Sequence, residues 1–190
     1  MHIVFAIKPH GYVDMTKALI GDVEKAIQAL GDLRSGFDQF WARTLVRSFF
    51  ALVEACTHEL KNVVLQAAAN GVITLSDGER AVLSDVTFDV SSDGSILERP
   101  RFVPIERHLR LLHTLMDRLF GSDAALPVSD HRFGKFKASI HIRNRITHPK
   151  SIDDTSLSNS EVETVMLAAS WYGDVQRTLL ARWYAIVNRA

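Results

Sequence analysis

The sequence predicts an all-α protein, an up-and-down bundle of four to five main helices with a small β-hairpin inserted at about residues 86–98. Three observations support this fold class. Apolar residues recur at helical spacing along most of the chain, helix-start and helix-stop signals separate these stretches, and only one short segment alternates as strands do. A chain of 190 residues that is 47% hydrophobic can bury one core, so we expect residues 1–190 to form a single helical domain.

Two long helices are expected in the N-terminal half of the chain. The apolar stretch 2–7 suits a short strand or a packed extension, and Asp14 or Thr16 can cap a first helix that ends at Gly31. Ser35 begins a capping pattern for a second helix, which should continue to about residue 69. Its expected core stripe comprises Trp41, Leu45, Phe49, Leu52, Cys56, Leu60, Val63 and Ala67.

The middle of the chain carries the strand signals. Ser76 and Glu79 form a capping box that opens a short helix, which should end near Leu83. Residues 86–90 and 95–98 then alternate around Asp93-Gly94, a dipeptide typical of hairpin turns. This hairpin either guards a cleft or contacts a partner, or it is a surface decoration with no function of its own.

Three further helices complete the expected bundle. One should cover residues 105–120, because its apolar positions recur with helical period. Asp130 can cap the next helix, and Ser160 together with Glu163 can cap the last one.

Charge is distributed unevenly along a chain whose net charge is zero. Residues 131–150 contain six Lys or Arg and three His but no carboxylate, and the remainder holds 16 basic and 22 acidic residues. A basic segment on an otherwise acidic chain is typical of a site for a nucleic-acid backbone. The alternative is a solvated helix face that acidic neighbours neutralise in the folded chain.

Composition also bears on location. The single cysteine, Cys56, cannot form an intrachain disulfide and is expected to be buried. No apolar run reaches the length of a membrane span, and the first residues lack the basic leader of a secretory signal. We therefore expect a cytoplasmic protein that does not contact a membrane.

The most informative stretch ends the basic segment. Arg143, Asn144 and His148 bring a guanidinium, an amide and an imidazole within two helical turns, and Pro149 should end the helix at His148. The negative end of the helix dipole would then lie beside the imidazole and favour its protonated form. Histidine can move a proton near neutral pH, and arginine can stabilise the charge of a phosphate.

Helical geometry separates Arg143 from His148. At about 100° per residue, and with Ile140 at the centre of the expected apolar face, Asn144 lies near 40°, His148 near 80° and Arg143 near −60°. Arg143 and His148 would therefore be roughly 140° apart, an awkward arrangement for binding one phosphate. A second chain would resolve this difficulty, which predicts a homodimer.

At Arg143, Asn144 and His148 the sequence resembles the nuclease branch of the HEPN superfamily, whose motif is an arginine, a polar residue and a histidine a few positions later. The resemblance implies an up-and-down helical bundle that dimerises so that both motifs line one cleft. It also implies metal-independent cleavage of RNA by a toxin or an anti-phage defence protein. A toxin of this kind would have an antitoxin partner, of nucleotidyltransferase type.

The same resemblance implies that a polar residue of an earlier helix braces the motif. Glu54 or Arg47 of the second helix can be this bracing residue. Both lie off the core stripe of that helix, as does Lys61. The alternative for Glu54 and Arg47 is an ordinary surface pair, because they are two turns apart on the helix.

Four basic residues are expected to contact RNA: Arg145, His141, Lys150 and Lys137. Arg145 points away from the edge shared by Asn144 and His148, so it is either a phosphate contact or a salt-bridge partner. His141 lies seven residues before His148 and points in a similar direction, and it either supports RNA binding or is simply exposed.

No metal or cofactor is expected. His58-Glu59 begins like the helix signature of zinc proteases, but Asn62 occupies the position of the second ligand. Asp153-Asp154 could bind a divalent ion, yet this loop lacks further acidic ligands and the pair is better explained by solvation.

Two functions from different classes follow. The first is a metal-independent endoribonuclease in which Arg143 holds the scissile phosphate, His148 moves the proton and Asn144 orients His148 or the phosphate. Its products would carry 2′,3′-cyclic phosphate ends. The second is an inactive HEPN-like module that binds a nucleotide, an RNA or a protein, with Arg143 and His148 in structural roles. A further possibility is a structural subunit, for which a buried motif without an open cleft would be the sign.

Overall fold

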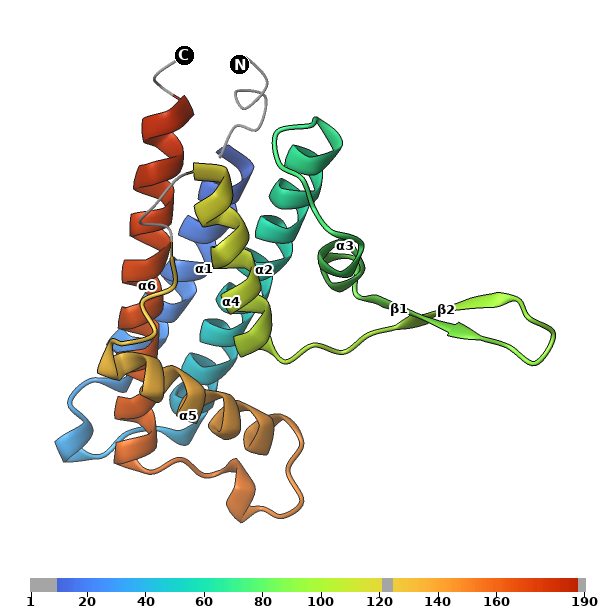
Figure 1. The fold of residues 1–190 in the computed structure, drawn as a ribbon. Coiled ribbons are helices and arrows are strands. Elements are labelled where there is room, and N and C mark those ends of the chain that lie inside the picture. The colour runs from blue at the N-terminus through green and yellow to red at the C-terminus, as the bar shows by residue number, and fades with distance from the viewer. Residues whose placement is uncertain (1–9, 121–124, 188–190) are drawn as a thin grey trace. The chain divides into compact units, whose positions relative to one another are not determined.

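The computed structural model describes residues 10–120 and 125–187, which are helical apart from one hairpin and the connecting segments (Figure 1). The helices are α1 (His10–Leu30), α2 (Gln39–Ala69), α3 (Asp77–Leu83), α4 (Ile105–Phe120), α5 (His131–Thr147) and α6 (Asn159–Val187). The strands β1 (Val86–Val90) and β2 (Ile96–Pro100) form the antiparallel hairpin, and η2 (Leu33–Ser35) and η3 (Asp153–Thr155) are single 3-10 turns. The predicted fold class, a helical bundle with an inserted hairpin, is confirmed. The extension expected at residues 2–7 lies outside the described residues.

The chain divides into two compact units. Among the described residues, unit 1 comprises residues 57–120, 125–126 and 182–187, and therefore contains the second half of α2, α3, the hairpin and α4. Unit 2 comprises Pro9–Cys56 and Pro127–Ala181, and contains α1, the first half of α2, α5 and most of α6. The single domain stays a prediction, because compactness does not test whether either unit folds alone.

An aromatic core positions α5 within unit 2. Phe136 of α5 packs against Phe49 and Phe50 of α2, and Phe133 and Phe136 both pack against Trp171 of α6, with contacting ring centroids 5.2 to 6.4 Å apart. All five rings are buried. In Figure 1, α5 crosses α2 and α6 rather than running parallel to them. Because buried aromatic rings contribute much of a core's apolar area, these contacts determine which side of α5 faces solvent.

Ion pairs join α3 and the base of the hairpin to neighbouring helices in unit 1. Arg118 of α4 lies 3.1 Å from Glu79 of α3, and Lys61 of α2 pairs with Asp85, which connects α3 to β1. Asp85 has a φ of 55°, a left-handed conformation that aspartate tolerates better than most residues. The sequence places Lys61 off the core stripe of α2, but its side chain is buried, because the Asp85 carboxylate compensates its charge.

Several predicted helix and turn signals are confirmed. Ser76 and Glu79 form the expected capping box of α3, with the Glu79 N–H donating to Ser76 Oγ at 3.3 Å. Asp130 caps α5 by accepting the N–H of Arg132 at 2.8 Å. Gly94 has a φ of 82° in the hairpin turn, as the Asp93-Gly94 signal predicts.

Three helix starts differ from the predicted ones. α1 already includes His10, so neither Asp14 nor Thr16 is its cap. α2 begins at Gln39, because Ser35 belongs to the preceding turn η2. α6 begins at Asn159, because the hydroxyl of Ser158 rather than that of Ser160 accepts the N–H of Glu161, at 3.3 Å.

No helix within residues 10–120 and 125–187 has a stretch that is both long enough and apolar enough to cross a bilayer.

Candidate functional site

The helix α5 ends where the sequence predicts. His148 is its C-cap, with φ −125° and ψ 59°, and its backbone N–H donates to the carbonyl oxygen of Asn144 at 3.0 Å. Pro149 follows, and it disfavours a helical conformation at the residue before it. The His148 side chain is exposed, so the imidazole is accessible from solvent at the C-terminal end of the helix.

The buried side of α5 is rotated from the predicted one. The buried residues are Phe133, Phe136, Ser139, Ile142 and Ile146. The centre of this side lies about 80° from Ile140 on the helical wheel and close to Arg143. The prediction is therefore wrong in taking Ile140 as the centre, and the reason is that Phe136 packs against Phe49 and Trp171. Ser139 is buried on the same side, because its hydroxyl donates to the Phe136 carbonyl oxygen at 2.7 Å. Arg143 thus leaves the helix next to the core, and His148 leaves it on the solvent side.

Arg143 packs against α2 within unit 2. Its guanidinium carbon lies 5.8 Å from the centroid of the Phe50 ring, and Nη2 pairs with the carboxylate of Glu54. Nη1 donates to Oδ1 of Asn144 at 3.2 Å. The side chain is nevertheless 32% exposed, so the guanidinium can still be reached by a ligand.

Glu54, and not Arg47, is the residue of α2 that braces Arg143. Arg47 is exposed and has no ion-pair partner among residues 10–120 and 125–187, so the alternative of a surface pair between Arg47 and Glu54 is not formed. Phe50 was not among the residues predicted for the site. Its position four residues before Glu54 would have revealed it, because residues at this spacing share one side of a helix.

Arg145 organises the loop that follows the motif. Its Nη1 donates to the carbonyl oxygens of Asp154 at 3.1 Å and Ser156 at 2.9 Å, and its Nη2 lies 2.6 Å from the carboxylate of Glu161. Of the two roles expected for Arg145, the structure shows the salt bridge. Its contact with RNA stays a prediction.

Asp154, itself a residue of this loop, holds the loop's backbone through its carboxylate. Its Oδ2 accepts the backbone N–H groups of Lys150 at 2.8 Å and Ser151 at 3.0 Å. These two bonds, with the Lys150 N–H first, hold the pKa of the Asp154 carboxyl below its ordinary value. The Lys150 side chain remains exposed.

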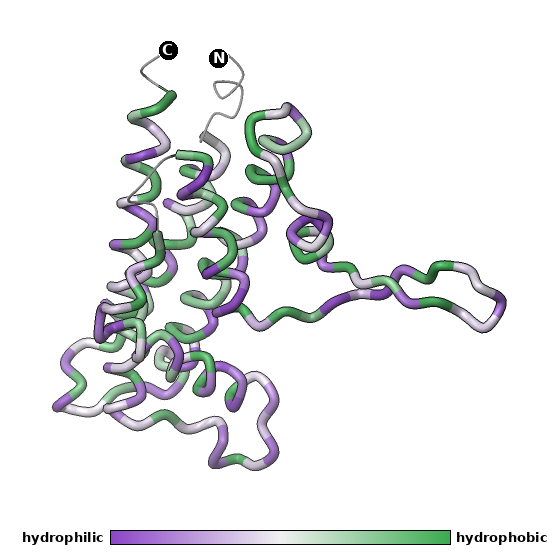
Figure 2. The backbone as a smooth tube through the Cα atoms, viewed as in Figure 1, coloured by the Kyte–Doolittle hydropathy of each residue, from purple (hydrophilic) through white to green (hydrophobic). Residues whose placement is uncertain are grey.

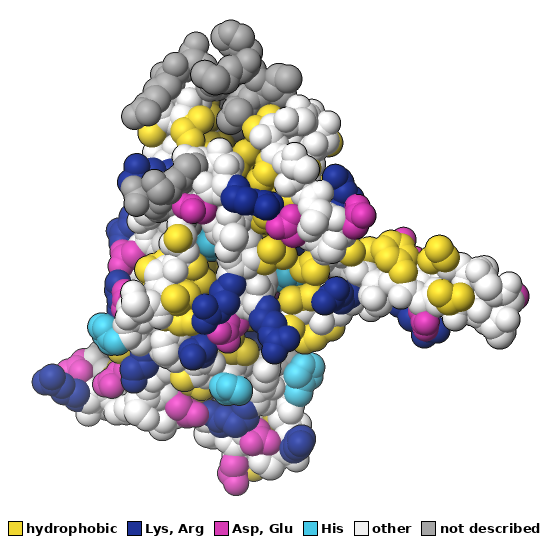
Figure 3. Space-filling model, viewed as in Figure 1, with side chains coloured by type: hydrophobic (Ala, Val, Ile, Leu, Met, Phe, Trp, Pro, Cys, Tyr) yellow, Lys and Arg dark blue, Asp and Glu magenta, His cyan; other side chains and the backbone are white. Residues whose placement is uncertain are grey.

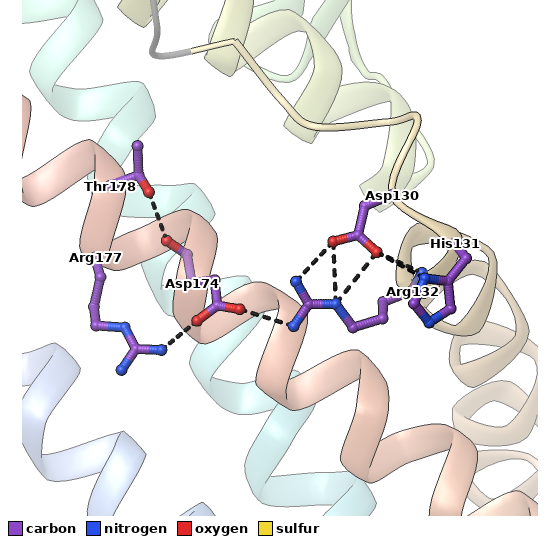
Figure 4. Close-up of polar contacts among 6 residues, drawn as sticks. All are labelled: Asp130, His131, Arg132, Asp174, Arg177 and Thr178. Atoms are coloured by element: carbon purple, nitrogen blue, oxygen red, sulfur yellow. Dashed lines mark hydrogen bonds and ion pairs between the residues drawn. The ribbon is translucent and has the colours of Figure 1, made fainter.

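Arg132, at the start of α5, is also neutralised by carboxylates (Figure 4). Its guanidinium lies between Asp130, 2.7 Å from Nη2, and Asp174 of α6, 2.8 Å from Nη1. Hydrogen bonds from Arg132 lower the pKa of both carboxyls below their usual range. Figure 4 shows Arg177 reaching the second oxygen of the same Asp174.

The basic segment 131–150 therefore has two parts. Its three arginines, Arg132, Arg143 and Arg145, each pair with carboxylates of neighbouring elements. Its three lysines, Lys135, Lys137 and Lys150, are exposed. Neutralisation by acidic neighbours, the alternative to an anion site, thus holds for the arginines and not for the lysines.

The solvent side of α5 carries a polar stripe made of Lys137, His141, Asn144 and His148. These residues are four, three and four positions apart, so they lie along one side of the helix. All four side chains are exposed, and no carboxylate of α5 interrupts them. The motif is accessible at both His148 and Arg143, unlike the buried motif expected of a structural subunit.

The described residues contain no cluster of three or more His, Cys, Asp or Glu side chains that could hold a metal ion. No protein-family model, no curated protein and no solved structure matches the chain. The resemblance of Arg143, Asn144 and His148 to the HEPN motif therefore stays a prediction. A function has to be inferred from the chemistry of α5 and its neighbours.

Proposed function

We propose that the protein is a metal-independent endoribonuclease whose site is formed by Arg143, Asn144 and His148. One observation supports this most strongly. The end of α5 presents a braced but partly exposed guanidinium together with an exposed imidazole, and the imidazole continues a polar stripe that begins at Lys137. Positive charge for a phosphate and a group that transfers protons are the two needs of RNA cleavage without a metal.

The proposed reaction uses the substrate's own nucleophile. The ribose 2′-oxygen attacks the adjacent phosphorus, the bond to the departing 5′-oxygen breaks, and the products are a 2′,3′-cyclic phosphate and a 5′-hydroxyl. His148 accepts the proton of the 2′-hydroxyl and delivers a proton to the departing 5′-oxygen. Arg143 would stabilise the negative charge on the phosphate oxygens, and Asn144 would orient its guanidinium through their hydrogen bond.

A second copy of the chain would complete this site. Arg143 leaves α5 on its core side and His148 on its solvent side, about 140° apart on the helical wheel. In the proposed homodimer, His148 of each copy serves the phosphate that Arg143 of the other copy holds. The polar stripes would then supply further contacts to the RNA backbone through Lys137 and His141.

His148→Ala is the direct test. The purified variant should lose RNA cleavage while its helix content stays unchanged, because the His148 side chain is exposed. The matched control is His131→Ala, which removes another exposed histidine of α5, at the opposite end of the helix, and should cleave like the unmodified protein. EDTA should leave the rate unchanged, and the product ends should be cyclic phosphates. Full activity of His148→Ala, or loss of activity with EDTA, contradicts the proposal.

A second candidate is a module that binds RNA or a protein without cleaving RNA. The pairing of Arg143 with Glu54 and Phe50 favours it, because an arginine held in this way can serve the structure of unit 2 alone. Binding of single-stranded RNA without any cleavage, weakened by Lys137→Gln, would support this candidate over the nuclease. Growth inhibition on expression, relieved by His148→Ala, would instead support a nuclease toxin, for which an antitoxin of nucleotidyltransferase type is the expected partner.

A further inference from the structure

The hairpin of unit 1 exposes apolar side chains that a monomer leaves in water. The exposed fractions are 59% for Phe88, 69% for Val90 and 73% for Ile96. Hydrophobic side chains are gathered along the hairpin in Figure 3, and hydrophobic and hydrophilic residues follow one another along its strands in Figure 2. A hairpin of two strands is marginally stable in water, so a further strand or a packed surface would stabilise it.

One face of the hairpin is apolar and the other is polar. Residues that are paired across the two strands point to the same face. The apolar face carries Val86, Phe88, Val90, Ile96, Glu98 and Pro100. The polar face carries Thr87, Asp89, Leu97 and Arg99, with an ion pair of 3.3 Å between Asp89 and Arg99.

The outer edge of β1 presents the backbone groups of Val86, Phe88 and Val90. The backbone N–H of Ser91 donates to the carbonyl oxygen of Ser95 at 2.9 Å, and the N–H of Arg101 donates to the carbonyl oxygen of Asp85 at 2.7 Å. Alternate residues of an antiparallel strand bond to the neighbouring strand, so the odd-numbered residues of β1 bond to β2 and the even-numbered ones turn outward. The outward N–H of Val90 is held at 2.9 Å by the side chain of Asp89, its neighbour in the chain.

We propose that a second copy of this chain pairs with the outer edge of β1, antiparallel and with Phe88 opposite Phe88. In this register Val86 of each copy lies opposite Val90 of the other, and the outward N–H of Val90 exchanges its bond to the Asp89 side chain for one to the Val86 carbonyl oxygen of the other copy. The two β1 strands become the centre of a four-stranded antiparallel sheet. The apolar faces of the two hairpins then join into one surface, with the two Phe88 rings as a cross-strand pair.

The charges favour a second copy as the occupant of this edge. When Phe88 lies opposite Phe88, Thr87 lies opposite Asp89, so no like charges are directly opposed. A register centred on Asp89 would instead oppose two carboxylates. The outer edge of β2 suits self-pairing less well, because Glu98 would oppose Glu98 in the centred register and Pro100 has no N–H to donate.

This inference goes beyond the proposed ribonuclease. The paired strands belong to unit 1, whereas Arg143 and His148 belong to unit 2. The homodimer proposed for RNA cleavage joins the ends of α5, so the readout here is the change in mass that Phe88→Lys produces. Self-pairing of β1 can therefore hold or fail whether or not RNA is cleaved.

Phe88→Lys tests the paired edge by light scattering over a concentration series. The mass of the unmodified protein should rise with concentration to at least twice that of the 21.3 kDa chain. Phe88→Lys should raise the dissociation constant about tenfold or more, because it places two lysines opposite each other at the centre of the sheet. The matched control is Phe102→Lys, since Phe102 is 91% exposed and lies beyond the end of β2, and it should leave the mass unchanged.

Hydrogen exchange gives a second readout at the same edge. The Val86 amide should exchange more slowly as the protein concentration rises, and this protection should disappear in Phe88→Lys, whose far-UV circular dichroism should match that of the unmodified protein. Three results would overturn the proposal: a monomer at every concentration, a dimer that Phe88→Lys leaves intact, or equal dissociation of Phe88→Lys and Phe102→Lys.

Discussion

Arg143 contacts three different kinds of group: the ring of Phe50, the carboxylate of Glu54 and the amide of Asn144. A planar guanidinium can stack on a ring while its edge donates hydrogen bonds, which an ammonium group cannot do. Because Arg143 and Glu54 are both partly exposed, their ion pair should stabilise the fold by about 1 kcal/mol or less. Its main effect is to restrict the orientation of the guanidinium.

Arg143→Lys separates charge from orientation. The variant keeps a positive charge but loses the planar guanidinium and its several directed N–H donors, so the rate of RNA cleavage should fall about tenfold or more. The free energy of unfolding should change by less than about 1 kcal/mol. Initial cleavage rates and urea titrations measure the two effects. Arg47→Lys, at an exposed arginine of α2, is the control and should change neither quantity. Equal cleavage rates for Arg143→Lys and the unmodified protein would remove Arg143 from the site.

At the scale of single residues, the sequence predicted which groups could be chemically active but not all of their neighbours. Glu54 was one of two candidate braces, and choosing between it and Arg47 required the position of α5 relative to α2 within unit 2. Phe50 was missed because the expected core stripe of α2 was narrow and included Phe49 but not its neighbour Phe50. The structure buries both rings, and only Phe50 lies within 5.8 Å of the Arg143 guanidinium.

At the scale of elements, Arg145 makes several of the contacts that hold the loop between α5 and α6. Arg145 reaches two backbone carbonyl oxygens of this loop and the carboxylate of Glu161 near the start of α6. A hydrogen bond to a charged donor is stronger than one between neutral groups. Arg145 therefore keeps the segment after His148 in a defined path.

Arg145→Gln should loosen this loop. Loss of the guanidinium should lower the free energy of unfolding by about 1 to 2 kcal/mol and speed trypsin cleavage after Lys150, because two loop carbonyls lose their donors. Timed proteolysis and urea titration are the measurements. Lys137→Gln, at an exposed residue of the same helix, should leave cleavage after Lys150 unchanged. Weaker RNA binding by Arg145→Gln without faster proteolysis would mean that Arg145 acts as an RNA contact instead.

The rotation of α5 shows where sequence patterns are weakest. Its two phenylalanines and three isoleucines do not lie on one narrow stripe, so periodicity alone did not identify the buried side. Packing against Phe49 and Trp171 decided it. By contrast, both ends of α5 follow from local signals, the Asp130 cap and Pro149.

At the scale of the whole molecule, stability should depend on pH through His108, which is buried in unit 1. Burial lowers its pKa below the ordinary value, and the nearby charge of Lys61 lowers it further, while the Asp85 carboxylate acts in the opposite direction. The unfolded chain therefore binds a proton at His108 more readily than the folded chain does. In the unfolded chain the pKa of histidine is about 6.5. Above this pH, His108 does not change the free energy of unfolding, and below it His108 lowers that free energy as the pH falls.

The free energy of unfolding should accordingly decrease between about pH 7.5 and pH 5.5, and His108→Gln should show a smaller decrease. Urea titrations at several pH values measure the difference. His131→Gln is the control, because the exposed His131 side chain lies on the surface of unit 2, and it should keep the pH dependence of the unmodified protein. A pH dependence that is the same with and without His108 would contradict this explanation.

The sequence by itself determined the helical class, the hairpin and its turn, the capping box of α3 and both ends of α5. These features depend on caps, prolines, glycines and alternation, which act over a few neighbouring residues. Only the tertiary structure decided that Arg143 pairs with Glu54, that Arg145 holds the following loop, that Lys61 is buried beside Asp85 and that α5 turns Arg143 toward the core. These outcomes join residues far apart in the chain, and packing rather than local preference brings such residues together.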